Sequence, residues 1–243
     1  MTLRALVHDY ETTGVKPKTC GVVQSAIMLI DLQEDGSWEF VAHEVAKHNP
    51  GEPIPDGASK IHGIYDRDVA HLPDYEESLS ATFEQAEREF GYTAVIGYNS
   101  NKFDNVIGRR LGMKDGVIEI DLFVACQRLM TLGHLSRARL VDAYSELVGG
   151  STDNAHDAEA DLEMTLALIK PVMKLLDIPT VTALSEWLNT PFAHPKMLIP
   201  FGKYRGYPMT EVPKTYLRWI VEKAKDMNDD LRASAKEALN AHP

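Results

Sequence analysis

Hydrophobic residues fall into five short runs along the first half of the chain. The first run is interrupted only by Arg4, and the second is longer and rich in Val and Ile. A turn at Gly36 joins the second run to the third, as in a β-hairpin. We predict one β-strand in each run: residues 3–7, 21–32, 38–45, 93–98 and 117–122.

Helical patterns alternate with the later strands. The last long pattern has apolar residues at Leu162, Leu166 and Ile169 and continues to about residue 176, with Asp153-Asn154 as its predicted N-cap. Three strands followed by alternating helices and strands predict an α/β domain with a mixed five-stranded sheet flanked by helices. The preceding predicted helices are residues 75–90, 101–111, 122–130 and 138–148.

A proline-containing segment separates this pattern from the end of the chain. Residues 190–200 carry three prolines and predict a linker or an ordered crossing. A short helix is expected before it at residues 180–188, and two helices after it, one opening at Pro213 and one at residues 229–240. We therefore predict a domain over residues 1–189 and a small, mainly helical module over residues 196–243.

Composition narrows the class of protein. A chain of 243 residues with 44% hydrophobic and 25% charged residues is typical of a globular protein with a sizeable core. No apolar run approaches the roughly 18 residues of a membrane span, and the N-terminus lacks a signal-peptide pattern. Cys20 and Cys126 are far apart without metal-ligand spacing, so we expect both to be buried. These features predict a cytoplasmic protein.

Charge is unevenly distributed. The net charge of −11 argues against broad electrostatic binding to nucleic acid. Residues 196–243, however, hold nine Lys or Arg and six Asp or Glu, a net of +3, so the remainder carries −14. Several carboxylates that bind metal would neutralise part of that negative charge.

Two carboxylates at the end of the first strand indicate a possible metal site. Side chains alternate faces along a strand, so Asp9 and Glu11 point the same way. Their repulsion is relieved when a cation lies between them, and hard oxygen ligands favour Mg²⁺ or Mn²⁺. Taken alone, most Asp-x-Glu triplets are solvated strand ends, so the rest of the chain has to complete the ligand set.

Three further residues complete the candidate set. Asp104 lies near the start of a helix, Asp161 inside the last long helix, and His156 near that helix's first turn. Five residues turn a helix by about 140°, so His156 and Asp161 converge only if His156 belongs to the entering loop. Each also has a plain structural interpretation, as a helix-terminal acid, a solvated helix face or a capping histidine.

Together these residues match an ordered set of motifs. The sequence resembles the DEDDh family of 3′→5′ exonucleases, which has a ribonuclease H-like fold. The likeness covers roughly residues 1–176 and is most detailed with the nuclease domain of bacterial exonuclease I. The motifs are Asp-x-Glu-Thr at residues 9–12, Asn99 with Phe103-Asp104, and His156-Asp157-Ala158 with Ala160-Asp161.

The resemblance implies a site and a mechanism. Two Mg²⁺ ions, or Mn²⁺ in their place, would lie about 3.5–4 Å apart and be held by four carboxylates, with Asp9 bridging them. His156 would be the general base that takes a proton from the attacking water. The product would be a nucleoside 5′-monophosphate. The implied metal ligands are Asp9, Glu11, Asp104 and Asp161.

The resemblance also implies a position for the 3′-terminal nucleotide. Thr12 and a loop at residues 61–64 would lie against it, with His62 where exonuclease I has Thr in its Thr-Gly-Ile sequence. The implied substrate-binding residues in this part of the chain are Thr12, His62, Gly63, Ile64 and Asn99.

The C-terminal segment has two interpretations. Residues 201–206 and 213–219 interleave basic and aromatic residues and are similar to the small C-terminal module of exonuclease X-like proteins. The aromatic residues either form the core of a packing module or stack on bases while Lys203 and Arg205 neutralise phosphates. Exonuclease I continues into an SH3-like domain and a helical domain. We expect this chain to lack both domains, and therefore to lack high processivity.

Three functions follow from this reading. The leading prediction is a 3′→5′ exonuclease whose partner is single-stranded DNA with a free 3′ end. An RNA-trimming exonuclease is the alternative and depends on room for a 2′-OH at the terminal sugar. A non-catalytic adaptor on a nuclease fold would have lost a metal carboxylate, and none is lost in this sequence.

Overall fold

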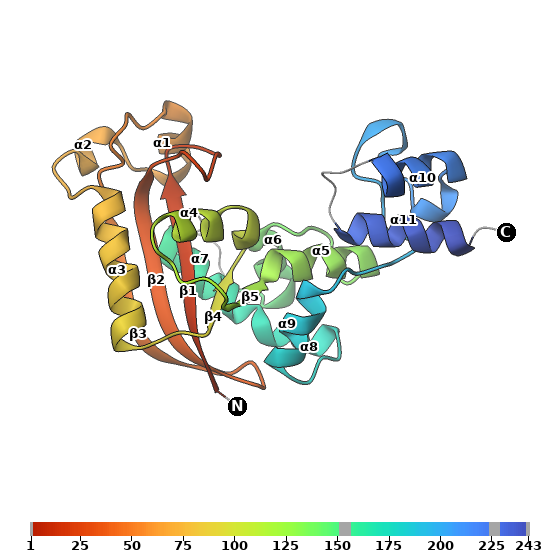
Figure 1. Ribbon diagram of the computed structural model, residues 1–243, viewed down its shortest axis with the longest axis horizontal. Helices are drawn as coiled ribbons and strands as arrows, with labels where there is room; N and C mark the ends of the chain where they lie inside the picture. The colour runs from red at the N-terminus through yellow and green to blue at the C-terminus, as the bar shows by residue number, and fades with distance from the viewer. Residues whose placement is uncertain (1, 151–156, 224–228, 242–243) are drawn as a thin grey trace.

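A computed structural model describes residues 2–150, 157–223 and 229–241 and contains one mixed sheet in the strand order β3-β2-β1-β4-β5. The strands are β1 (Thr2–Thr12), β2 (Val22–Gln33), β3 (Trp38–Lys47), β4 (Ala94–Gly97) and β5 (Ile118–Asp121). The first three strands are antiparallel, and β1, β4 and β5 are parallel to one another. This confirms the predicted mixed five-stranded sheet (Figure 1).

Helices cover both faces of the sheet, which explains why β1 and β2 are apolar on both sides. One face packs on α3 (Tyr75–Glu89) and α4 (Asp104–Arg110), against which Leu6 and Tyr10 of β1 lie. The other face packs on the remaining helices of the domain, against Ala5 and Val7. These helices are α5 (Leu122–Leu132), α6 (Leu140–Leu147), α7 (Ala158–Ala167), α8 (Ile169–Leu175) and α9 (Val181–Asn189).

The connection between β3 and α3 differs from the prediction. Residues 61–64 were expected to form a loop, but Ile61 and His62 end helix α1 (Asp56–His62). Gly63 closes the helix with φ 74°, a left-handed conformation that favours glycine. A second short helix, α2 (Asp66–Val69), follows directly. The hydrophobic pattern was too short to separate one helical turn from a loop.

The last long helix is shorter than predicted at its start and is broken in two. It begins at Ala158, and the carboxylate of Asp157 caps it by accepting from two backbone N–H groups. The predicted cap, Asp153-Asn154, lies outside the described residues. The helix ends at Ala167 and α8 begins at Ile169, because Pro171 has no N–H to donate to the carbonyl of Ala167.

The C-terminal segment has a small apolar cluster of its own. The 3₁₀-helices η2 (Gly202–Tyr204) and η3 (Met209–Glu211) precede α10 (Lys214–Lys223) and α11 (Asp229–Ala241), which is the blue part of Figure 1. The cluster comprises Ile199, Met209, Val212, Leu217, Ile220, Leu231, Ala235 and Ala238. Among the described residues, no helix is long and apolar enough to cross a membrane.

The crossing between the two parts is held by hydrogen bonds. Phe192 N donates to Asp230 Oδ1 at 2.8 Å, and His194 N donates to Ser234 Oγ at 2.9 Å. Arg128 of α5 forms an ion pair with Asp230 of α11, with Nε 2.8 Å from Oδ2. Residues 190–200 therefore form an ordered crossing.

Candidate active site

The end of β1 presents two carboxylates on one side of the strand. Asp9 and Glu11 are half-buried, whereas His8 and Tyr10, which alternate with them, are buried on the other side. Thr13 and Gly14 then leave the strand in a turn, and Thr12 Oγ1 donates to the carbonyl of Gly14 at 2.9 Å. The strand period alone thus aims both carboxylates in the same direction.

Asp104 is the first residue of α4 and is 4% exposed. Burial raises the pKa of Asp104 to about 8, with the carboxylates of Asp121 and Glu11 adding to the rise against hydrogen bonds from the backbone. Asp104 thus resists ionisation although it lies at a helix N-terminus, where negative charge is normally favoured, because burial and two neighbouring carboxylates outweigh that effect.

The carboxylates of three elements act on one another. Burial raises the pKa of Asp9 well above its usual range, followed by the charges of Asp104, Asp161, Glu11 and Asp157. Burial, together with Asp161 and Asp157, raises the pKa of Glu11 to about 7. The fold therefore brings Asp9 and Glu11 of β1, Asp104 of α4 and Asp161 of α7 into electrostatic range of one another. His156, the predicted base, lies outside the described residues.

The donor chemistry of this group fits a hard divalent cation. All four side chains offer oxygen atoms, and their mutual repulsion is relieved by positive charge. In the described part of the chain, no three Asp, Glu, His or Cys side chains already stand as a set that could hold a metal ion. The carboxylates therefore supply the charge and the ligand type that such a cation needs.

The predicted substrate-binding residues near α1 have differing environments. His62 Nδ1 accepts from the backbone N–H of Ile64 at 3.0 Å, so Nε2 carries the ring proton. That buried Nε2 has no hydrogen-bond partner among the described residues. Ile64 is 3% exposed and packs with Val23, Ile54 and Val69. Its side chain is part of the core, so only its backbone can face a substrate.

Asn99 is held by a residue that the sequence analysis missed. Asp121, at the end of β5, accepts from the backbone N–H groups of Asn99 (2.8 Å), Asn101 (3.1 Å) and Phe123 (3.0 Å). Asn99 has φ 63°, a left-handed conformation, and leads into the 3₁₀-helix η1 (Ser100–Lys102) just before Asp104. The signal available in the sequence was an acidic residue directly before an apolar helix, which is typical of an N-cap.

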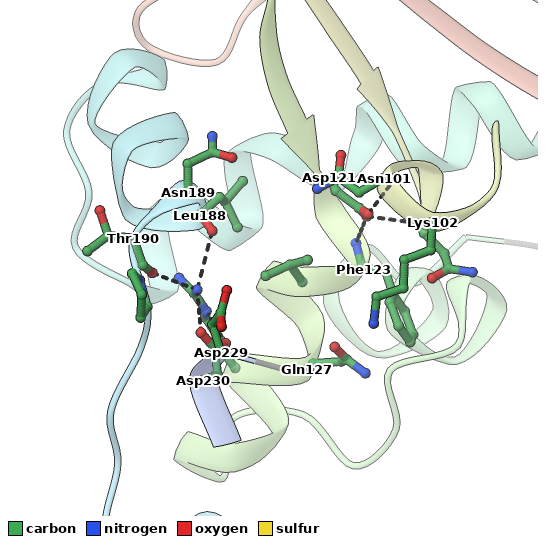
Figure 2. Close-up of a pocket in the computed structure, with 14 residues that line it drawn as sticks. Asn101, Lys102, Asp121, Phe123, Gln127, Leu188, Asn189, Thr190, Asp229 and Asp230 are labelled. Carbon is green, nitrogen blue, oxygen red and sulfur yellow. Dashed lines mark hydrogen bonds and ion pairs between the residues drawn. The ribbon is translucent and has the colours of Figure 1, made fainter. Parts of the chain in front are cut away.

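A cavity of about 370 Å³ adjoins this turn (Figure 2). Lys102, Phe123 and Gln127 line one side, and Leu188, Asn189 and Thr190 line the other. Asp229 and Asp230 of α11 close it below, so the cavity lies where the C-terminal segment meets the sheet domain. Asp121 lines this cavity, and its charge also contributes to the raised pKa of Asp104.

Lys203 and Arg205 lie in the C-terminal segment and are exposed. Lys203 Nζ lies 5.4 Å from the ring centroid of Tyr204, and Tyr204 and Tyr216 pack edge to face at 4.8 Å. Tyr204 and Tyr216 are half-buried against the cluster, whereas Tyr207 is 51% exposed. The aromatic residues thus serve partly as core and partly as surface, and the C-terminal segment that carries both basic residues, the blue part of Figure 1, lies away from β1.

Solved structures with a similar fold are exonucleases. An exonuclease I structure aligns with a TM-score of 0.64 and 21% identity, over 95% of this chain and 61% of that chain. A zinc-bound complex of Escherichia coli exonuclease I with single-stranded DNA aligns with a TM-score of 0.63 and 19% identity, over 100% of this chain and 68% of that one. Exonuclease X in complex with 5′-overhanging duplex DNA aligns with a TM-score of 0.55 and 21% identity, over 76% and 99%.

Two family models match different parts of the chain. No curated protein matches the chain. Residues 192–225 match a model described as "Putative quorum-sensing-regulated virulence factor". Residues 6–169, which contain most of β1 and all of α4 and α7, match the model described as "Exonuclease". That match covers more than half of the 243 residues and includes all the predicted carboxylates, so the chain belongs to the DEDDh-type exonuclease family with its ribonuclease H-like fold.

Proposed function

We propose that this chain is a divalent-metal-dependent 3′→5′ exonuclease that hydrolyses single-stranded DNA to nucleoside 5′-monophosphates. The observation that carries the proposal is the convergence of carboxylates from three elements, β1, α4 and α7, whose charges raise one another's pKa. Perturbed carboxyl groups of this kind gather at functional sites because a charged ligand compensates them.

In the proposed mechanism, Asp9, Glu11, Asp104 and Asp161 hold the cation or cations. Bound Mg²⁺ or Mn²⁺ supplies positive charge to the phosphate oxygens and makes water more acidic. His156 takes a proton from the attacking water, and the four carboxylates must be ionised for this arrangement to form. Burial of Asp104 excludes bulk water from one wall of the site.

Substrate contacts are proposed in two places, near the carboxylates and in the C-terminal segment. Thr12, His62, Gly63 and Asn99, with the backbone of Ile64, would contact the 3′-terminal nucleotide. Lys203 and Arg205 would neutralise phosphates of a longer strand. The support for the first set is the family membership of the chain, and for the second the net charge of +3 in residues 196–243.

Single-stranded DNA is proposed as the substrate because relatives of similar fold have been solved with single-stranded DNA and dA16 oligonucleotides. An exoribonuclease is the alternative within the same chemistry. The proposal of an enzyme rather than an adaptor is supported by the retention of all four carboxylates.

One experiment tests this proposal. Matched DNA and RNA oligonucleotides, labelled at the 3′ or the 5′ end, are incubated with the chain and Mg²⁺, and the products are resolved as a ladder. We expect mononucleotides released from the 3′ end of DNA, no cleavage of a circular single strand, and complete loss of activity in EDTA or with Asp9→Ala. Full activity in EDTA would contradict the metal-dependent mechanism, and RNA-selective cleavage would favour the alternative.

A further inference from the structure

A chain of buried hydrogen bonds lies on the side of β1 that faces away from Asp9 and Glu11. The Tyr10 hydroxyl is 3.0 Å from His8 Nδ1, and His8 Nε2 is 2.7 Å from Asn105 Oδ1. The three side chains are 5%, 1% and 1% exposed. Buried polar groups are stable only when they are hydrogen-bonded, so each contact in this chain contributes to the fold.

The hydrogen bonds made by Asn105 determine which atoms donate in this series of hydrogen bonds. Asn105 Nδ2 donates its two hydrogens to Asn101 Oδ1 at 3.1 Å and Glu119 Oε2 at 3.3 Å. The amide oxygen of Asn105 therefore faces the imidazole, so His8 Nε2 carries the proton and donates to it. The other ring nitrogen, Nδ1, accepts from the Tyr10 hydroxyl. The imidazole thus uses both of its nitrogens, and no apolar ring could replace it.

These hydrogen bonds join β1, which carries Asp9 and Glu11, to α4, which carries Asp104. His8 precedes Asp9 on β1, and Asn105 follows Asp104 on α4, although His8 and Asn105 are 97 residues apart in the sequence. Helix α4 also packs closely on the ring: a Cβ added at Gly108 would lie 3.5 Å from His8 Cε1. One direct hydrogen bond therefore connects the residues adjacent to two of the proposed metal ligands.

We propose that His8 is a positioning residue whose hydrogen bond to Asn105 fixes α4 against β1 and so sets the placement of Asp104 relative to Asp9. The inference rests on the proposed function, because it takes Asp9 and Asp104 to be ligands of the same metal site. A purely apolar contact would let the helix slide, since dispersion has no preferred direction. A buried hydrogen bond weakens steeply when its angle or length changes, so it defines one arrangement.

His8 acts through Asn105 and not on the substrate. Its ring lies on the opposite face of β1 from the carboxylates, because successive side chains of a strand alternate. Removing an outer partner of a metal ligand lowers metal affinity or activity by about 10–100-fold. His8 is one step further from the ligand, so we expect a loss of about tenfold in each.

The test measures metal affinity separately from catalysis. Mn²⁺ alone is titrated calorimetrically into the metal-free full chain, and cleavage of a single-stranded oligonucleotide is measured in parallel. His8→Phe should weaken Mn²⁺ binding and lower kcat about tenfold, with the KM for DNA unchanged. Asn105→Ala should do the same, and the double variant should lose no more than the worse single variant, because both break one connection.

The matched control is His48→Phe. His48 is also a buried histidine, 1% exposed, but its Nε2 lies 2.8 Å from Ser25 Oγ, so this hydrogen bond joins it to β2 and not to α4. It should lower thermal stability as His8→Phe does while leaving Mn²⁺ affinity and kcat unchanged. A loss of affinity that merely reflects a weakened fold would appear in both variants.

Equal Mn²⁺ affinity in folded His8→Phe and His48→Phe would overturn the inference. If His8→Phe does not fold, Asn105→Ala decides, because it removes the other partner of the same hydrogen bond; unchanged Mn²⁺ affinity there would also overturn the inference. A wild-type chain that binds no Mn²⁺ contradicts the inference as well. A wild-type chain that binds Mn²⁺ but cleaves no oligonucleotide contradicts only the proposed function, and the affinity comparison still holds.

Discussion

At the scale of single residues, the acidic site destabilises the metal-free fold. Burial and neighbouring charges raise the pKa of Glu11 to about 7 and that of Asp104 to about 8, from ordinary values of 4.5 and 3.8. A carboxyl group with a raised pKa in the folded state favours folding only while it is protonated. Its contribution is therefore lost as the pH rises from the unfolded value through the folded one, here between about 4 and 8.

This linkage predicts that Asp104→Asn stabilises the metal-free protein. The amide keeps the shape of the side chain and removes its charge, so the variant should melt at least about 2 °C above the wild type at pH 8, corresponding to roughly 1 kcal/mol in a chain of this size. The difference should vanish at about pH 3, below the ordinary carboxyl pKa of 3.8, where the wild-type side chain is mostly protonated in both states. Thermal unfolding in EDTA at the two pH values measures it; a lower melting temperature at pH 8 would contradict the electrostatic account.

The proposed base gives a second prediction at this scale. His156→Ala should lower kcat by about 10²–10⁴, the usual contribution of a general base. Mn²⁺ affinity should stay the same, because His156 is not a proposed ligand. Single-turnover cleavage, in which chemistry limits the rate, provides the measurement, and an unchanged rate would return His156 to a structural role.

At the scale of elements, an ion pair ties the sheet domain to the C-terminal helices. The Arg128 and Asp230 side chains are 3% and 11% exposed. Arg128 also donates to the carbonyls of Leu188 and Thr190, at 3.3 and 2.8 Å, and its guanidinium lies 4.6 Å from the Trp187 ring centroid. A charge with this many partners orders the crossing as well as the two helices.

Breaking this pair should be strongly destabilising. Asp230→Ala leaves the Arg128 charge buried without its carboxylate and should lower the free energy of unfolding by about 3–5 kcal/mol. The control is Lys114→Ala, whose bond to Glu87 is also short, at 2.7 Å, but whose side chains are over 40% exposed; it should cost only about 0–1 kcal/mol. Urea unfolding measures the free energy of unfolding of both variants. Equal losses in the two variants would contradict a special stabilising role for the Arg128–Asp230 pair.

At the scale of the whole molecule, the charges are divided between the two parts. Residues 196–243 carry +3 and the remainder −14, yet the proposed substrate is a polyanion. A strand longer than the terminal nucleotide would therefore be repelled by most of the surface, and the C-terminal segment is the part with the opposite sign.

We predict that Lys203→Ala with Arg205→Ala weakens binding of long single strands more than binding of di- or trinucleotides. The slope of log affinity against log salt should become shallower by about 1–2, because up to two fewer counterions are released. Lys170→Ala with Lys174→Ala makes the same change in net charge from exposed positions on α8 and should leave the slope unchanged. Equal salt slopes in the two double variants would favour a packing role for the C-terminal segment.

Much of the fold could be predicted from the sequence, because the hydrophobic periods of strands and helices depend only on residues that are near one another in the chain. The alternation of β1 determines that Asp9 and Glu11 share a side, and the five apolar runs correspond to the five strands. The departures have local causes. The carboxylate of Asp157 caps the described helix α7, whereas Asp153-Asn154 was the predicted cap. Pro171 interrupts a helical pattern that hydrophobic spacing alone would continue. Motif order also identified the carboxylates, although it carried no information on their separation.

Only the tertiary structure decided which of these residues act on one another. The raised pKa of Asp9 depends on burial and on charges from α4 and α7, about 95 and 150 residues away in the chain. The sequence pattern assigned no role to His8, whose bond to Asn105 exists because β1 and α4 meet across a buried face. The sequence placed Arg128 in a predicted helix without a role, and the structure shows that α11 brings Asp230 beside it. Such contacts have no local pattern, because the energy of a buried polar pair depends on burial and geometry that the packed fold alone creates.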